Sequence, residues 1–205
     1  MPEITIYTDG SALGNPGPGG YGAVLISGRF RKEVSQGYRL TTNNRMELLA
    51  VCVALEMLKF EGSDVTIYSD SKYVVDAVEK RWVFGWEKKG FAGKKNPDLW
   101  TRFLRSYRRH NVRFIWVKGH ADTVENNRCD QLAVAAANDR AHLQEDTGYV
   151  PQWRVSHIKN KKPRNTTKCP GTFKKTIRSH GRPNPGRHCP THLLPPYLYL
   201  TYFRT

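Results

Sequence analysis

The sequence has no long uninterrupted apolar run and no close pair of cysteines. Its longest apolar stretch, residues 193–203, is broken by Pro195 and Pro196 and is too short to cross a bilayer. No basic and apolar leader opens the chain, and no internal repeat is visible. The four cysteines are widely spaced, which favours reduced thiols over a disulfide framework. These absences argue against a membrane-spanning or disulfide-rich secreted protein, and we expect a soluble, cytoplasmic one.

Acidic residues are missing from the last part of the chain. Residues 150–205 contain 12 Lys or Arg and no Asp or Glu, whereas residues 1–149 carry 21 Lys or Arg against 18 acids. The same tail holds 8 of the 12 prolines and shows no sustained periodicity, so it is not expected to bury a core. We therefore predict a folded domain over residues 1–149 and a basic, largely disordered tail over 150–205. The tail is either an arm that holds a polyanion or an incidental extension.

The first 149 residues alternate between patterns typical of strands and of helices. Strands are predicted at 3–9, 21–27, 33–41, 64–69 and 112–117, and helices at 43–60, 72–81, 97–110 and 125–143. Three strands followed by alternating helices and strands predict an α/β fold with a mixed sheet covered by helices. The first strand is expected to end at Asp9 and Gly10, because glycine allows the backbone to turn sharply.

Four carboxylates fall near the ends of these predicted elements. Asp9 ends the first strand and Asp70 the fourth, while Glu47 lies in the first turn of the first long helix and Asp130 in the last helix. Sites in open sheets gather where strands run out, so these side chains could meet in one cleft. Each acid also has a structural interpretation: a turn for Asp9, a capping box of Asn44 with Glu47, an N-cap for Asp70, and a solvent-facing position for Asp130.

Several longer motifs are spread over residues 3–149. They are Tyr7-Thr-Asp-Gly-Ser11, Asn15-Pro-Gly-Pro-Gly-Gly-Tyr-Gly22, Thr41-Thr-Asn-Asn-Arg-Met-Glu-Leu48, Ser69-Asp-Ser71, Trp116-Val-Lys-Gly-His-Ala121 and Asn126-Asn-Arg-Cys-Asp130. In order and spacing they closely resemble type 1 ribonuclease H of the bacterial kind. The resemblance implies a ribonuclease H-like five-stranded mixed sheet whose central strand carries Asp9. It also implies an endonuclease that hydrolyses the RNA strand of RNA–DNA hybrids and leaves 5′-phosphate and 3′-hydroxyl ends.

By this resemblance the four acids would form a catalytic metal site. Asp9 would bridge two divalent ions, Glu47 and Asp70 would complete one side, and Asp130 would hold the other. An all-carboxylate site suits Mg²⁺, with Mn²⁺ as a substitute, and argues against zinc. His120 matches the family's loop motif and would carry a proton or help product release, although a lone loop histidine can also be merely solvated.

The resemblance further implies contacts to a hybrid duplex. The residues concerned are Asn15, Thr42, Asn43, Asn44, Lys72, Trp82, Trp86, Lys88, Lys89 and Asn96. Short amides such as Asn15 and Asn43 would contact 2′-hydroxyl groups, and Thr42 with Asn96 would hold a DNA phosphate. Residues 81–95 would form a basic protrusion along the sugar–phosphate backbone, unless its tryptophans belong to the core.

Two positions depart from the family's pattern. Asn127 stands where many relatives have Glu, and Lys72 where many have Gln. These departures concern the surroundings of the metal site and one duplex contact. Two other functions stay open at this point: a hybrid-binding module that no longer cuts, and a nuclease of the same fold, such as an integrase or exonuclease, that acts on DNA. We expect a monomer with no membrane partner.

Overall fold

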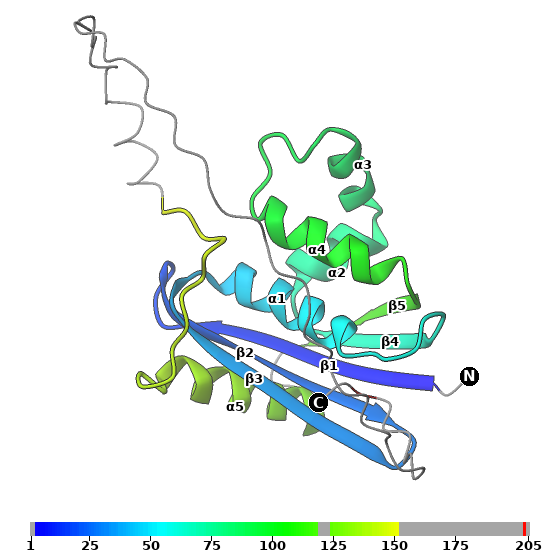
Figure 1. Ribbon diagram of the computed structural model, residues 1–205, viewed down its shortest axis with the longest axis horizontal. Helices are drawn as coiled ribbons and strands as arrows, with labels where there is room; N and C mark the ends of the chain where they lie inside the picture. Colours follow the sequence, from blue (N-terminus) through cyan, green and yellow to red (C-terminus); the bar gives the residue numbers. More distant parts are fainter. Residues whose placement is uncertain (1–2, 119–123, 152–202, 204–205) are drawn as a thin grey trace, which may run out of the picture. The chain divides into compact units, whose positions relative to one another are not determined.

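A computed structural model describes residues 3–118, 124–151 and 203 (Figure 1). The strands are β1 (Glu3–Ala12), β2 (Gly17–Ser27), β3 (Phe30–Thr41), β4 (Asp64–Ser69) and β5 (Asn111–Trp116), and the helices are α1 (Asn43–Glu56), α2 (Lys72–Glu79), α3 (Trp82–Lys88), α4 (Pro97–Tyr107) and α5 (Val124–Asn138). The strands form one sheet in the order β3-β2-β1-β4-β5. β1 pairs antiparallel with β2 and parallel with β4, so the predicted mixed sheet with a central first strand is confirmed.

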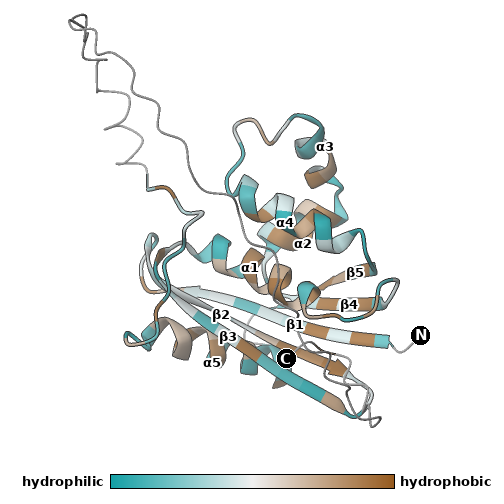
Figure 2. Ribbon diagram, viewed as in Figure 1, coloured by the Kyte–Doolittle hydropathy of each residue, from teal (hydrophilic) through white to brown (hydrophobic). Residues whose placement is uncertain are grey.

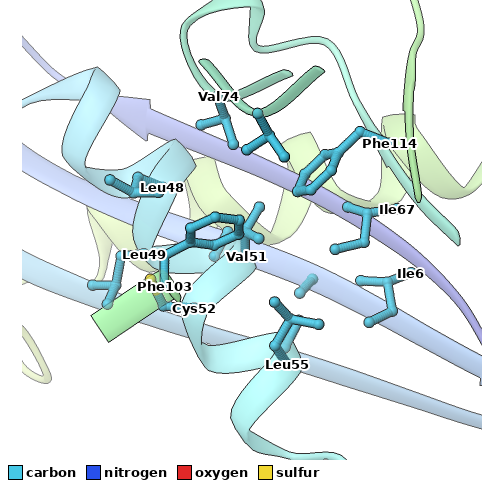
Figure 3. Packing of buried hydrophobic residues seen from close by; sticks show 14 of the residues in the cluster. Ile6, Leu48, Leu49, Val51, Cys52, Leu55, Ile67, Val74, Phe103 and Phe114 are labelled. Atoms are coloured by element: carbon cyan, nitrogen blue, oxygen red, sulfur yellow. The ribbon is translucent and has the colours of Figure 1, made fainter. Parts of the chain in front are cut away.

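Helices cover both faces of this sheet. Figure 1 shows α5 on one face and α1 to α4 on the other. Hydrophobic segments recur along β1, β4 and β5 in Figure 2, and their side chains meet the helices in Figure 3, where Ile6, Ile67 and Phe114 from three strands face Leu55 of α1 and Phe103 of α4. Burial of each such side chain contributes about 1.5–3 kcal/mol to the stability of the fold. This packing holds the strands in place against the helices.

The first strand does not end where the sequence predicted. β1 continues beyond Asp9 to Ala12 along β2, whereas its pairing with β4 stops at Thr8 opposite Ser69. Gly10 is extended rather than turning, and a Cβ atom there would lie 2.2 Å from the backbone nitrogen of Glu47. The glycine is needed because α1 passes close to the strand, and Asp9 lies where β1 and β4 separate.

Several other boundaries also differ from the predictions, and α1 and α4 end earlier than predicted, at Glu56 and Tyr107. Residues 17–20 were predicted as part of a turn, but β2 already begins at Gly17 and β3 at Phe30. α5 ends at Asn138 rather than near residue 143. The predicted basic segment 81–95 contains the short helix α3.

The predicted tail lies mostly outside the described residues. Phe203 is described: it is 6% exposed, forms an isolated antiparallel bridge with Leu58, and joins the hydrophobic core. At this residue the tail contributes to the core, which its composition did not predict. In the described ranges, no helix is both long enough and apolar enough to cross a membrane.

Candidate active site

The four predicted carboxylates line a single hollow of about 280 Å³. Asp9 comes from β1, Glu47 from α1, Asp130 from α5, and Asp70 from the residue pair between β4 and α2. The rest of the lining consists of Gly10, Ser11, Asn43, Asn126 and Asn127. Acids up to 121 positions apart in the chain are thus brought together by one strand, two helices and one connection.

Local structure explains why Asp70 is available to this hollow. β4 ends at Ser69, and the side chain of Ser71 caps α2 by accepting a hydrogen bond of 3.3 Å from the backbone N–H of Val74. The N-cap interpretation of Asp70 is therefore wrong, because its neighbour has that role. The backbone carbonyl of Asp70 accepts a 3.0 Å hydrogen bond from the indole N–H of Trp116, which ties the turn to β5.

Glu47 is held by two donors rather than by a capping box. The N-cap of α1 is Thr42, so Asn44 lies inside the helix. The Glu47 carboxylate accepts hydrogen bonds from Asn43 Nδ2 at 2.8 Å and from Ser71 Oγ at 2.5 Å. These contacts fix the carboxylate at the edge of the hollow, between α1 and the start of α2.

Asp130 reaches the hollow because α5 packs very closely on β2. Gly22 pairs with Asp9 across the sheet, and a Cβ atom at Gly22 would lie 2.2 Å from the carbonyl oxygen of Cys129. A larger residue would push α5, and Asp130 with it, away from Asp9. Asp130 is half-buried and lines the hollow, so the solvent-facing alternative for this residue is not what the structure shows.

The clustered acids are electrostatically strained without a cation. Burial, together with the charges of Asp70, Asp130 and Glu47, raises the pKa of Asp9 to about 8, although a 2.7 Å hydrogen bond from the Gly10 N–H opposes the shift. Burial also raises the pKa of Glu47, with Asp70 adding to the effect, although the hydrogen bonds from Ser71 and Asn43 oppose it. Like charges in a poorly solvated place require either protons or metal ions.

The set of donors fits a hard divalent cation. Carboxylate oxygens are the ligands that Mg²⁺ and Mn²⁺ prefer, and no thiol or imidazole lines the hollow among the described residues. As the side chains stand, no three Asp, Glu, His or Cys residues in the described part of the chain surround a common ion position. That spacing is expected for acids that repel one another. His120 lies outside the described residues.

The predicted duplex contacts are spread over several parts of the described structure. Asn43 lines the acidic hollow, with Thr42 and Asn44 beside it in the chain. Asn15 is exposed in the connection between β1 and β2. Lys72 is exposed at the start of α2, and its ammonium lies 5.0 Å from the centre of the Trp116 ring.

A second hollow, of about 360 Å³, lies over α3. Its lining consists of Arg81, Trp82, Gly85, Trp86, Lys89, Ala92 and Lys94. Trp82 is 46% exposed, whereas Trp86 packs edge-on against the buried Trp100 with ring centres 5.7 Å apart. Trp86 thus packs against the core and also lines the hollow, so the core interpretation holds in part and the duplex contact stays a prediction. Lys88 is exposed on the same helix.

Sequence reasoning missed an ionic cluster around Arg45. Arg45 is buried in the first turn of α1 and pairs with Asp98 at 2.8 Å and with Asp146 at 2.8 Å. A basic residue on the apolar side of a helix was the available signal, but its partners lie far along the chain. Asn126 was also missed as a site residue: it lines the hollow, and its Oδ1 has no hydrogen-bond partner among the residues that the structure describes.

Known proteins resemble this chain over the same region. The family model described as RNase H matches residues 1–138. A Ribonuclease H of Syntrophus aciditrophicus is 55% identical over 152 residues, which cover 72% of this chain and 87% of that protein. A Ribonuclease H of Desulforamulus reducens is 58% identical over 142 residues, covering 67% and 89%. The crystal structure of LC9-RNase H1, a type 1 RNase H with the type 2 active-site motif, has a TM-score of 0.63 at 32% identity and covers 78% of this chain and 84% of its own.

Proposed function

The chain belongs to the ribonuclease H family, and from that premise we propose that it is an endonuclease that hydrolyses the RNA strand of RNA–DNA hybrids. One observation supports the catalytic assignment above all: Asp9, Glu47, Asp70 and Asp130, from four separate segments of the chain, line one hollow. A hybrid-binding module without catalysis would not need four carboxylates whose burial and mutual repulsion raise the pKa of Asp9. The proposed products carry 5′-phosphate and 3′-hydroxyl ends.

We propose that these four carboxylates hold two Mg²⁺ ions, with Mn²⁺ as a substitute. The donor chemistry and the raised pKa of Asp9 support this assignment. When bound, such ions make the attacking water more acidic and stabilise the leaving oxygen. Asp9, on the central strand, would bridge the two positions, Glu47 and Asp70 would complete one, and Asp130 the other.

The side chains around the acids would then bind and orient the duplex. Asn43 already donates to Glu47 at 2.8 Å, which leaves its amide oxygen to accept from a ribose 2′-hydroxyl beside the metal site. Asn15 would reach the same strand from the connection after β1, with Asn44 beside Asn43. Such contacts would distinguish RNA from DNA without reading a base sequence. His120 would carry a proton or assist product release, a proposal that rests on its sequence motif.

The DNA strand would follow a basic and aromatic surface on α3. Lys80 lies 5.0 Å from the centre of the Trp82 ring and Lys94 lies 4.9 Å from that of Trp86, so cations and aromatic faces alternate around the second hollow. Lys88 and Lys89 would add phosphate contacts, as would Lys72 on α2. Thr42 and Asn96 would hold one DNA phosphate. A surface of this kind binds a backbone largely independently of sequence.

A panel of four labelled substrates tests the proposed function. Incubated with the protein and Mg²⁺, the RNA–DNA hybrid is expected to be cut in its RNA strand, while double-stranded RNA, double-stranded DNA and single-stranded RNA stay intact. Efficient cutting of double-stranded DNA would identify a DNA nuclease of the same fold. Tight binding of the hybrid without any cutting would identify a binding module.

Residues 1–149 are proposed to be the catalytic domain, and 150–205 a basic appendage. Truncation after Val150 is expected to retain hybrid cleavage, because every proposed contact lies before that point. It should lower the free energy of unfolding by about 1.5–3 kcal/mol, the value of one buried aromatic side chain, because Phe203 is lost. Thermal and denaturant melts of the full chain and the truncated chain measure the difference.

The matched variant for that truncation is Phe203→Ala, which should lose the same stability with the tail still present. Loss of cleavage on truncation would contradict the proposed domain boundary. If the tail also holds the duplex, truncation will flatten the dependence of hybrid affinity on salt, whereas Phe203→Ala will not.

We further propose a monomer in the cytoplasm, where Cys52 and Cys129, both free and buried, would stay reduced.

A further inference from the structure

The segment after α5 holds a buried carboxylate against the end of β3. Asp146 is 7% exposed in its side chain, and it accepts a 2.7 Å hydrogen bond from the Thr41 hydroxyl. It also accepts two bonds of 2.8 Å from the guanidinium of Arg45. The backbone N–H of Arg39 donates to the carbonyl of Gln144 at 2.9 Å, so this segment lies alongside the last residues of β3, just before α1.

The guanidinium of Arg45 extends the same cluster to α4. It donates to both carboxylate oxygens of Asp98, at 2.9 and 2.8 Å, and to Asn96 Oδ1 at 3.4 Å. Asn96 Nδ2 in turn donates to the hydroxyl of Tyr73 at 3.1 Å. One buried guanidinium thus connects Asp146 to the residue that caps α4.

These contacts flank the proposed duplex-binding residues on both sides. Thr41 and Arg45 are the residues immediately before and after Thr42, Asn43 and Asn44. Thr42 is the N-cap of α1 but its side chain makes no capping hydrogen bond, so capping does not fix this turn. The hydrogen bonds that Asp146 accepts from Thr41 and Arg45 fix it instead.

We propose that Asp146 is a positioning residue. It holds residues Thr42–Asn44, the first turn of α1, in the geometry that the hybrid duplex requires, and it holds Asn96 in place through Arg45. The inference rests on the proposed function and deepens it. Charge alone predicts the opposite effect, because a carboxylate near a phosphate contact repels the phosphate. The sign of the change in affinity on removing Asp146 therefore separates positioning from electrostatics.

Three variants test the proposal by steady-state hybrid cleavage at a temperature well below each melting point. Thr41→Val keeps the shape of the side chain but removes the hydroxyl that Asp146 binds, whereas Thr41→Ser keeps the hydroxyl. Asp146→Asn removes the negative charge at nearly constant shape. We expect Thr41→Val and Asp146→Asn to raise KM about two- to tenfold, as one lost hydrogen bond would, with kcat nearly unchanged. Thr41→Ser should stay close to wild type.

Two control variants isolate the effects of charge and of stability. Glu145→Gln makes the same charge change one residue away, at a side chain that is 72% exposed and pairs with Arg39, and it should leave KM unchanged. Arg102→Met removes the pair of Arg102 with Glu56, which connects α4 to α1 away from the turn. It should lower the melting temperature without changing KM.

The outcomes are distinct. An unchanged KM for Thr41→Val and Asp146→Asn, with a lower melting temperature, would show that Asp146 only stabilises the fold and would overturn the proposal. A lower KM for Asp146→Asn would show that charge outweighs position and would overturn it as well. A wild-type protein that cuts no hybrid would instead reject the proposed function, before any variant is compared.

Discussion

Asp70→Asn is expected to reduce turnover of the hybrid by at least about 100-fold, while hybrid binding persists. Loss of a residue that only orients a metal ligand costs up to about 100-fold, and loss of a ligand itself should cost at least as much. The substitution keeps the size of the side chain and removes one of the negative charges lining the hollow. The proposed phosphate contacts on α3 lie on a different surface and stay intact. Cleavage rates with Mg²⁺ and hybrid affinity by fluorescence anisotropy measure the two properties separately.

Asp76→Asn is the matched control for that substitution. Asp76 lies on α2, six residues away, where it pairs with Lys80 on the surface at 2.9 Å, outside the hollow. The control makes the same charge change and should leave turnover close to wild type. If binding and cleavage fall together in Asp70→Asn, or if the melting temperature collapses, the role of Asp70 is structural.

Asp9→Asn is expected to stabilise the metal-free protein at pH 8 and to have little effect near pH 4. The pKa of Asp9 in the folded state, about 8, lies above its ordinary value of 3.8, so between these limits the folded state holds a proton that the unfolded chain releases. The free energy of unfolding therefore falls as pH rises through this window, by up to about 1.4 kcal/mol for each pH unit. Asparagine is neutral throughout and avoids the loss.

Melting temperatures in EDTA across pH 4–9 measure this effect. The difference between Asp9→Asn and wild type should grow from near zero at pH 4 to its maximum at about pH 8. Asp76→Asn, with its exposed carboxylate, should show no such growth. A difference that is equal at pH 5 and pH 8 would mean that burial and the neighbouring acids do not hold a proton on Asp9.

The sequence predicted most of the strands and helices because each depends on a local pattern. It also singled out four acids that the structure brings to one hollow, and their role in metal binding stays a prediction. Alternating β-branched residues and helical spacing identify elements, and an acid at the end of a strand is visible without knowing what lies across the sheet. The same local reasoning gave the wrong explanation for Gly10, because its conformational freedom was taken to allow a sharp turn. Its real contribution, space for the backbone of Glu47, depends on a helix more than thirty residues away.

Contacts between distant segments could not be predicted in the same way. The close packing of α5 on Gly22, which brings Asp130 to Asp9, requires the register of β1 with β2 and the position of a helix a hundred residues later. The cluster of Arg45 with Asp98 and Asp146 likewise joins three distant segments, and nothing in the local sequence around each charge indicates which residue it pairs with. Burial of Phe203 against Leu58 was hidden by the composition of the tail around it.

The central claim is that the acids at positions 9, 47, 70 and 130 bind the divalent ions that hybrid cleavage needs. Calorimetric titration of Mn²⁺ or Mg²⁺ into wild type and Asp9→Asn, at pH 8 and without substrate, tests it most directly. We predict saturable binding to wild type, accompanied by a rise in melting temperature, and the loss of both in Asp9→Asn while Asp76→Asn behaves as wild type. Equal binding to wild type and Asp9→Asn would place the ions elsewhere and contradict the assignment of the site.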